Sequence, residues 1–302
     1  MSSPLVSIGL PVYNGAKSLG RTVDSILSQD FKDFELVISD NASTDETRQI
    51  CEAYATADQR VRYHHNEANI GVSPNHDRVF EFSRGKYFAW SAHDVEQLPG
   101  MLTRCVREME ASSPPVILAY PRCEQIDENG LPVGGEVASI ASADPRPHRR
   151  LETVIENIGY VIQHFGLFAS EALRKTRLNG SYASSDFVLT AELAMLGEIR
   201  EIPEVLIRRR VESKGGTRAV LHDKKAWATW LNPKMKDRRF WLRIEERLAL
   251  EYIRSALSLP LRPMDKLACS LVGPYVHYRR RYSGAIGTMR LRLGRLKRGL
   301  VG

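Results

Sequence analysis

The first 92 residues alternate short apolar runs with amphipathic segments, and this pattern strongly limits the fold. The apolar runs are rich in β-branched and aromatic residues and predict strands at 5–13, 34–40, 61–66 and 86–92. The segments between them have helical spacing of apolar residues and predict helices at 16–29, 43–56 and 75–85. Such alternation predicts right-handed βαβ units and a mostly parallel sheet covered by helices.

A polar segment follows each predicted strand. These segments are residues 11–15, 39–45, 64–71 and 91–94. In open α/β sheets, ligands bind beyond the carboxyl ends of the strands. We therefore expect a ligand site where these segments meet, with Ser43 or Thr44 also serving as the N-cap of the following helix.

The pattern is less regular beyond Pro99. We predict helices at 101–110, 151–163 and 184–196, strands at 116–127 and 199–211, and a mobile, proline-containing loop at 136–150. The helix at 184–196 should be amphipathic, with Val188, Leu189, Leu193 and Leu196 on one face. It should be capped by Ser184 or Ser185 and ended by Gly197.

Composition indicates a globular protein. With 302 residues, 43% of them hydrophobic, the chain can bury a sizeable core. Its four cysteines are far apart and form no CxxC pair, which favours free thiols and a reducing, cytoplasmic setting. The N-terminus has no basic region typical of a signal peptide, and no stretch approaches the roughly 20 apolar residues of a membrane span.

The positive charge is concentrated at the C-terminus. Nine Lys or Arg residues and no acid follow Asp265, and because the whole chain carries +7, residues 1–265 carry −2. Met289, Leu293, Leu296 and Leu300 are spaced by four, three and four residues among these charges. This spacing predicts a basic amphipathic helix that attaches peripherally to an anionic membrane, with a solvated or domain-packing helix as the alternative.

Nucleic acid is the less favoured partner for this tail, since it lacks the aromatic residues of a base-stacking surface. If the membrane prediction holds, the protein would lie in the cytoplasm, at the inner face of the plasma membrane.

His93-Asp94, at the end of the fourth predicted strand, permits three interpretations from the residues alone. The pair could form a metal site, half of a catalytic pair, or a polar turn before the next helix.

Four stretches together resemble family 2 glycosyltransferases. They are residues 6–47 (VSIGLPVYNG to STDET), 66–90 (NEANIGVSPN to YFAW), 91–99 (SAHDVEQLP), and the pair GLFASEALRKT and SSDFVLTAELAMLGEIREIPEVLIRRR. The resemblance spans about residues 5 to 212, with the stretches in the family's order and spacing. It implies the α/β fold called GT-A, the nucleotide-diphosphosugar transferase type.

The resemblance also implies a domain organisation and a reaction. Residues 1–218 would form the GT-A domain, with a nucleotide-sugar-binding half at 1–100 and an acceptor half at 101–218, and 219–302 a helical extension. The reaction would move a sugar, with inversion, from a nucleoside diphosphate sugar to a hydroxyl of a glycan or lipid-linked acceptor. A degenerate, non-catalytic sugar-nucleotide-binding protein is the alternative.

The nucleotide-sugar site implied by the resemblance begins at the first two strand ends. Pro11, Tyr13 and Asn14 would line the nucleoside pocket, Asp40 would accept a hydrogen bond from the base, and Asn69 would also contact the donor. On local chemistry alone, Asn14-Gly15 is equally a turn, and 40–45 an Asx-turn with an N-cap.

The family's metal loop typically reads Asp-x-Asp, and here Ala92-His93-Asp94 occupies that triplet. Asp94 would be the ligand of a Mg or Mn ion on the diphosphate, since such an ion often uses only one or two carboxylates. Glu212 stands where relatives often have a His, and would be a second ligand.

Two further side chains are assigned to the donor, His93 and Arg209. His93 could contact the donor or be a loop imidazole bonded to the backbone, and its neighbour's side chain should point the opposite way. Among Arg208, Arg209 and Arg210, strand alternation lets only some face the diphosphate.

Asp186, in the first turn of the predicted helix, is the general base implied by the resemblance. We expect the helix dipole to lower its pKa and keep it ionised, whereas Glu192 should be structural. Two other reactions are disfavoured. One is glycoside hydrolysis with Asp94 and Glu96 as the acid and base pair. The other is nucleotidyl transfer, which would need a Gly-rich, basic loop after the first strand, and PVYNGAKSLG matches such a loop poorly.

Overall fold

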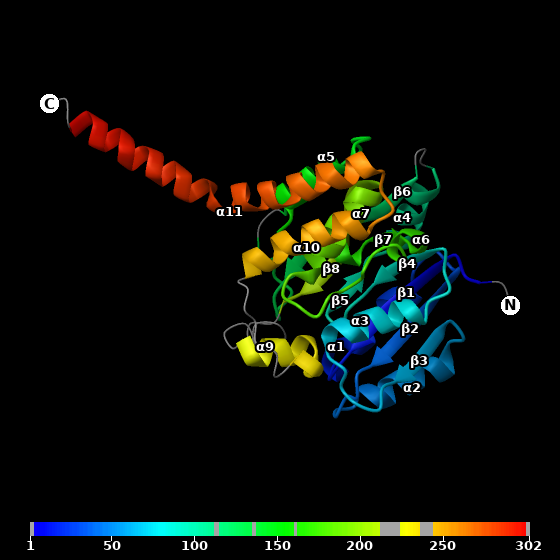
Figure 1. Ribbon diagram of the computed structural model, residues 1–302. Coiled ribbons are helices and arrows are strands. Elements are labelled where there is room, and N and C mark those ends of the chain that lie inside the picture. Colours follow the sequence, from blue (N-terminus) through cyan, green and yellow to red (C-terminus); the bar gives the residue numbers. More distant parts are fainter. Residues whose placement is uncertain are drawn as a thin grey trace.

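The protein is built on one eight-stranded sheet in the order β3-β2-β1-β4-β7-β6-β8-β5 (Figure 1). This computed structural model describes residues 3–111, 115–134, 137–159, 162–211, 224–235 and 244–299. The strands are β1 (Val6–Val12), β2 (Phe34–Asp40), β3 (Val61–His65), β4 (Tyr87–Trp90), β5 (Val95–Gln97), β6 (Val116–Ile126), β7 (Leu167–Ala169) and β8 (Glu198–Arg210). β5 and β7 run antiparallel to their neighbours and the other six share one direction, so the predicted mostly parallel sheet is confirmed.

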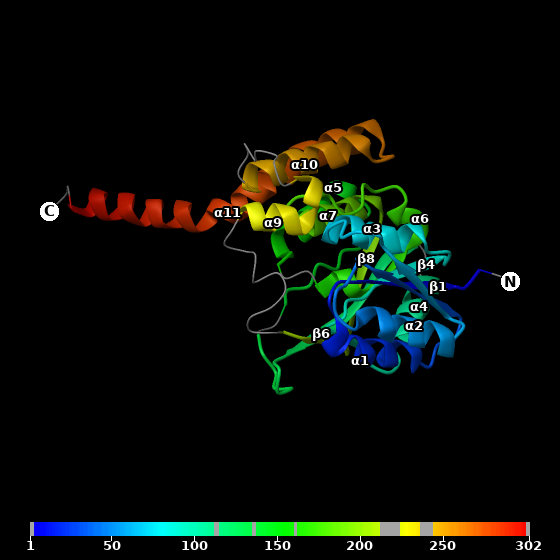
Figure 2. The same ribbon diagram turned by 90° about the horizontal axis from the view of Figure 1, so that it is seen from below.

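Helices cover both faces of this sheet. They are α1 (Ala16–Leu27), α2 (Thr47–Ala57), α3 (Val72–Glu81), α4 (Met101–Glu110), α5 (Pro147–Asn157), α6 (Ser170–Leu173), α7 (Ser185–Leu196), α9 (Lys224–Leu231), α10 (Ile244–Ser258) and α11 (Pro263–Gly299), with short 3-10 turns at Ile162–Phe165 and Pro233–Met235. One core joins α1, α2 and α4 to the sheet, and a second joins α3, α5 and α7 to its other face, as Figure 2 shows. With both faces covered, β1 and β2 are buried at every residue.

Register aligns the carboxyl ends of three strands. Val12 pairs with Asp40, and Asp40 pairs with His65. The loops that follow these residues therefore leave the sheet at the same edge, as the alternating sequence predicts.

α7 is buried on almost all sides, so the prediction of an amphipathic helix is wrong. Val188 and Leu189 and most residues up to Met195 are buried. The reason lies far along the chain: α10 and α11 pack over α5 and α7, and Leu248, Tyr252 and Val276 complete a third core with them. Part of the C-terminal region thus shares a core with residues 147–196.

Several local predictions need correction. Residues 137–150 of the loop predicted at 136–150 pack on the body: Ile140 is fully buried, its N–H donates to the Tyr120 hydroxyl at 3.0 Å, and Ser142 pairs with Ile199. The helix predicted at 43–56 begins only at Thr47, and neither Ser43 nor Thr44 caps it.

The predicted boundaries also shift elsewhere. α3 begins at Val72, three residues earlier than predicted, and α5 spans 147–157 and not 151–163. Ser184 does occupy the N-cap position of α7, but no side-chain capping bond forms there.

α11 is a single long helix, and its C-terminal half extends away from the sheet in both views (Figures 1 and 2). The predicted helix in the tail is therefore present up to Gly299, although the side chains beyond Tyr282 lie outside the description. Within the described ranges, no helix is both long and apolar enough to cross a membrane.

Candidate active site

A polar face of α1 holds the loop that follows β4. The Thr22 hydroxyl donates to the carbonyl oxygen of His93 at 2.9 Å, and the Ser25 hydroxyl accepts from the Gln97 amide at 3.1 Å. One turn on, the Gln29 side chain donates to the Gln97 and Leu98 carbonyls. Because Thr22, Ser25 and Gln29 follow one another at intervals of about one helical turn, their hydrogen bonds together fix the backbone on which Asp94 is carried.

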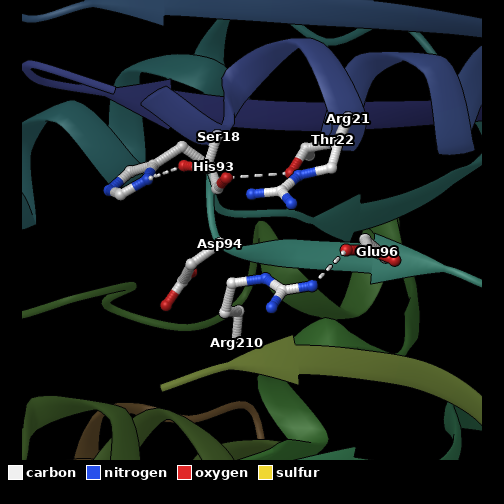
Figure 3. Close-up of a pocket in the computed structure, with 7 residues that line it drawn as sticks. All are labelled: Ser18, Arg21, Thr22, His93, Asp94, Glu96 and Arg210. Atoms are coloured by element: carbon white, nitrogen blue, oxygen red, sulfur yellow. Dashed lines mark hydrogen bonds and ion pairs between the residues drawn. The ribbon is translucent and has the colours of Figure 1, made fainter. Parts of the chain in front are cut away.

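His93 points toward the start of α1. Its Nδ1 lies 3.0 Å from the Ser18 hydroxyl. The His93 side chain also packs against Gly15, because a Cβ added to Gly15 would lie only 3.1 Å from the Cβ of His93. Figure 3 shows the His93 ring beside Ser18 of α1, whereas the Asp94 carboxylate points away from α1. The His93 ring thus bonds to the side chain of Ser18, and not to a backbone group as one interpretation of the sequence suggested.

Asp94 is paired with Arg209 across the sheet edge. Arg209 Nε donates to Asp94 Oδ2 at 3.1 Å, and the two side chains are 24% and 23% exposed. The pairing follows from register, because β5 runs antiparallel to β8 with Val95 opposite Arg209. The Arg210 amide also donates to the Asp94 carbonyl at 2.9 Å, so both backbone and side chain tie the loop to β8.

The three consecutive arginines of β8 go to different partners. Arg209 reaches Asp94 and lies over the Phe165 ring at 5.7 Å, whereas Arg208 donates to Glu124 at 3.0 Å. The predicted alternation is therefore present.

Arg210 lies on the other side of the loop from Arg209. It is 3.7 Å from Glu96 and donates to the carbonyls of Asp127 and Glu128. It joins a small pocket drawn in Figure 3, whose lining residues are Ser18, Arg21, Thr22, His93, Asp94, Glu96 and Arg210.

Sequence reasoning missed the contribution of α1 to this pocket. Ser18, Arg21 and Thr22 are spaced by three and one residues and share one face of the helix. The available signal was the row of small polar residues at Ser18, Thr22 and Ser25, which are four and three residues apart.

The β1 and β2 loops brace each other. Asn14 has a positive φ of 52°, and its side-chain oxygen accepts from the Thr44 amide at 2.8 Å, while its own amide donates to the Ser43 hydroxyl. Tyr13 beside it is 45% exposed, and Pro11 is buried within β1. Asn14 thus makes the turn, and the exposed Tyr13 is the aromatic side chain of this loop.

Asp40 is fully buried and already has three partners. One carboxylate oxygen accepts from the Ser43 amide at 2.9 Å, and the other contacts the Tyr63 hydroxyl at 3.0 Å and His65 Nδ1 at 3.2 Å. This is the Asx-turn considered from the sequence, with two aromatic partners added. A hydrogen bond from a nucleoside base to Asp40 stays a prediction and requires one of these partners to give way.

Asn69 shapes the loop before α3. Its side-chain oxygen accepts from the Gly71 amide and from the Asn41 side chain, both at 2.9 Å. The side chain is exposed, so its predicted donor contact is sterically open and stays a prediction.

Asp186 lies at the same edge of the sheet as these loops. α7 ends one residue before β8 begins and packs on β6 and β8, so it runs back along the strands and its first turn lies at their carboxyl ends. Ser184, which precedes it, holds a strained left-handed φ of 60°. The Asn179 amide also donates to Asp77 of α3, which fastens the approach to this turn.

The pKa of Asp186 is raised, contrary to the expectation from the helix dipole. Burial of the carboxyl is the largest cause, and the hydrogen bond from the Phe187 amide opposes it. Removal from water disfavours a carboxylate more than the first turn of a helix favours it.

Glu192 is structural, as expected. It is 1% exposed, accepts from Arg177 Nε and from the Ser255 hydroxyl at 2.8 Å each, and belongs to an ion-pair network with Glu251. The network links α7 to α10.

Asp94 is the predicted ligand through which a divalent cation would fit the candidate site. Among the described residues there is no cluster of three or more His, Cys, Asp or Glu side chains that would hold a metal. The Asp94 carboxylate uses Oδ2 in its bond to Arg209, and Mg can bind through one carboxylate when phosphate oxygens and waters complete its coordination. Glu212, the second predicted ligand, lies outside the described residues.

Comparison with known proteins places the chain in a family. Residues 7–177 match the family model "Glycosyl transferase family 2". An uncharacterized glycosyltransferase of Rickettsia felis is 26% identical over 283 residues, which cover 89% of this chain and 44% of that protein. An uncharacterized glycosyltransferase of Methanocaldococcus jannaschii is 32% identical over 132 residues, covering 43% and 45%. The chain spans less than half the length of these curated relatives.

Solved structures share the fold. S. aureus TarS residues 1–349, in complex with UDP-GlcNAc, superposes with a TM-score of 0.55 at 16% identity, covering 92% of each chain. The mannosyltransferase PcManGT of Pyrobaculum calidifontis, in complex with GDP-Man and Mn²⁺, gives a TM-score of 0.53 at 14% identity, covering 98% of this chain and 81% of that one. These structural similarities show that the chain has the GT-A fold. Because the family model matches more than half of the residues of the chain, the chain belongs to glycosyl transferase family 2.

Proposed function

We propose that the protein is an inverting glycosyltransferase that moves a sugar from a nucleoside diphosphate sugar to a hydroxyl of a glycan or lipid-linked saccharide. The observation that carries the proposal is the common edge of the sheet, where a cation-and-carboxylate pair, Arg209 and Asp94, and a half-buried acid, Asp186, both occur. Family membership supports sugar transfer, and the UDP-GlcNAc and GDP-Man of the two structural neighbours support a nucleotide-sugar donor.

The departing diphosphate needs positive charge close to it. Arg209 is fixed by its stacking on Phe165 and by its bond to Asp94, and a donor diphosphate would recruit it from that pairing. An Mg or Mn ion held by Asp94 would supply further charge neutralisation when it arrives with the diphosphate. Tyr13, exposed at the adjacent loop, is the aromatic surface available to the nucleoside.

The acceptor hydroxyl needs a base, and we assign this to Asp186. A carboxylate whose pKa is raised by burial accepts a proton more readily than one of ordinary pKa. The strained Ser184 before it favours a functional role for this turn.

The acceptor and the site of action form the less direct part of the proposal. A lipid-linked acceptor would suit peripheral attachment to the inner face of the plasma membrane through the basic segment 285–302, where each Lys or Arg near an anionic surface contributes about 1 kcal/mol.

Two measurements test the donor assignment. Thermal denaturation with a panel of nucleoside diphosphates and Mn²⁺ should show a rise in Tm for one base, since a ligand that binds only the native state stabilises it. Slow metal-dependent hydrolysis of the matching donor sugar should then fall about 100-fold or more in Asp94→Asn. Glu171→Gln, a change at an exposed first-turn acid of α6, is the matched control and should leave hydrolysis unchanged.

A second candidate function is sugar-nucleotide binding without transfer. The resemblance to family 2 glycosyltransferases implies carboxylates at the positions of Ala92 and Val95, and Asp94 is already paired with Arg209. This candidate is favoured if the nucleoside diphosphate raises Tm but neither hydrolysis nor transfer occurs with any acceptor preparation.

A further inference from the structure

The described part of α11 carries an exposed row of apolar side chains, which we call the apolar stripe. Its members, with their exposed fractions, are Met264 (74%), Leu267 (55%), Leu271 (66%), Tyr275 (63%), Tyr278 (37%) and Tyr282 (45%). Scattered exposed apolar residues need no explanation, but a contiguous row on one helix marks a contact surface.

The stripe is not the side of α11 that packs on the protein. The opposite side carries Cys269 and Val276, which are fully buried in the core shared with α5 and α10. Arg279 and Arg280 lie beside that contact, where they bond to Glu156 and to the Ile155 carbonyl of α5. The helix therefore has one face for the body and one apolar face left uncovered.

The stripe is regular enough to behave as one surface. Its members are separated by three, four, four, three and four residues. At 3.6 residues per turn they fall within an arc of roughly 80°. In the sequence the same spacing continues through Ala285, Met289, Leu293 and Leu296, so the pattern that predicted a short amphipathic tail runs along the whole of α11.

Charge and composition indicate what covers the stripe. No acid follows Asp265, while nine Lys or Arg residues do, so two copies of α11 laid together would bring like charges into contact. An anionic lipid surface would instead attract them. Three of the six members are tyrosines, which are enriched at the level of lipid headgroups.

From these observations we propose that the apolar stripe of α11, from Met264 to Tyr282, is a membrane-binding face that lies in the interface of an anionic bilayer. The proposal extends the attachment suggested for residues 285–302 and rests on the proposed function only for its biological purpose. In this proposal the first half of α11 inserts its apolar side chains into the membrane interface, and the basic second half is attracted to the anionic lipid headgroups.

The test is flotation of the full-length protein with vesicles of phosphatidylglycerol and phosphatidylcholine, or of phosphatidylcholine alone. The stripe variant is Leu267→Gln/Leu271→Gln/Tyr275→Gln, in which Gln keeps helix propensity close to that of Leu. The matched control changes three exposed apolar residues elsewhere, Leu131→Gln/Val133→Gln/Val205→Gln. Tm and donor hydrolysis without vesicles are measured for each protein, so that a loss of membrane binding is distinguished from a loss of fold or of activity.

We expect wild type and the control variant to float with anionic vesicles and not with neutral ones, and the stripe variant to bind at least tenfold more weakly with unchanged Tm. Equal binding by the stripe variant would overturn the proposal and leave attachment to the basic tail alone. Failure of wild type to bind anionic vesicles would also overturn it. A wild-type dimer in sedimentation, dissociated by the stripe variant, would identify the stripe as a self-association face instead.

Discussion

Replacing Arg209 with Gln should affect metal binding and donor binding in opposite directions. Arg209 Nε is 3.1 Å from Asp94 Oδ2, so a cation that binds Asp94 is repelled by the guanidinium and competes with it. Two unit charges 4 Å apart interact by about 1 kcal/mol in water and about 4 kcal/mol at an effective dielectric constant of 20.

Both side chains are about a quarter exposed, so solvent screening favours the low end of that range. About 1.4 kcal/mol corresponds to a tenfold change in Kd. Arg209→Gln should therefore bind Mn²⁺ about tenfold more tightly than wild type in the absence of donor. The same variant should bind the nucleoside diphosphate more weakly, because it loses a cation for the phosphates.

Titration of Mn²⁺ followed by electron paramagnetic resonance measures the first effect, and calorimetry with the nucleoside diphosphate measures the second. Arg208→Gln is the matched control, since Arg208 faces Glu124 and should change neither affinity. Unchanged or weaker Mn²⁺ binding in Arg209→Gln would refute the competition between Arg209 and the metal for Asp94.

Three further predictions concern buried charge. Burial raises the pKa of Asp77 to about 7, so the folded state holds a proton that the unfolded state releases near pH 4. Stability should therefore fall as pH rises from 4 to 7, and Asp77→Asn should flatten the dependence of Tm on pH while it still accepts from Asn179. Asp186→Asn should raise Tm at pH 7, because the pKa of Asp186 is also raised and its ionisation destabilises the fold; an unchanged Tm would argue against burial as the cause. Arg177→Met should cost about 3–5 kcal/mol in chemical denaturation, since Glu192 is 1% exposed and would lose its arginine partner, whereas Glu251 keeps Arg247 and Arg254; a cost below 1 kcal/mol would contradict that network.

Much of the sheet could be predicted because its main strands are long and apolar. β1, β2 and β6 stand out as hydrophobic runs between helical segments. β5 and β7 have three residues each, too few to show a periodicity, and both are stabilised by pairing with strands distant in sequence.

The sequence predicted which residues belong to the candidate site better than it predicted how those residues interact. Asp94 and Arg209 were assigned to different ligands, a metal and a donor, and their direct pairing depends on the register of strands 115 residues apart in the chain. The pKa of Asp186 was predicted in the wrong direction for a similar reason. The dipole of a helix is visible in the local sequence, whereas burial depends on the packing of the whole fold.

The stripe on α11 illustrates the same limit. Its spacing is present in the sequence, but α7 has similar spacing and is buried on nearly all sides. Only the packing of α10 and α11 shows which apolar helix faces are covered.

The central claim is that Asp186 is the base of an inverting transfer, and transfer kinetics of Asp186→Asn with a matched donor and acceptor test it most directly. We predict a product of inverted anomeric configuration by NMR. We also predict a loss of about 100- to 10,000-fold in kcat for Asp186→Asn, with donor affinity within about threefold of wild type, because a general base contributes to the transition state and not to donor binding. Retention of configuration, or a kcat within tenfold of wild type, would contradict the claim.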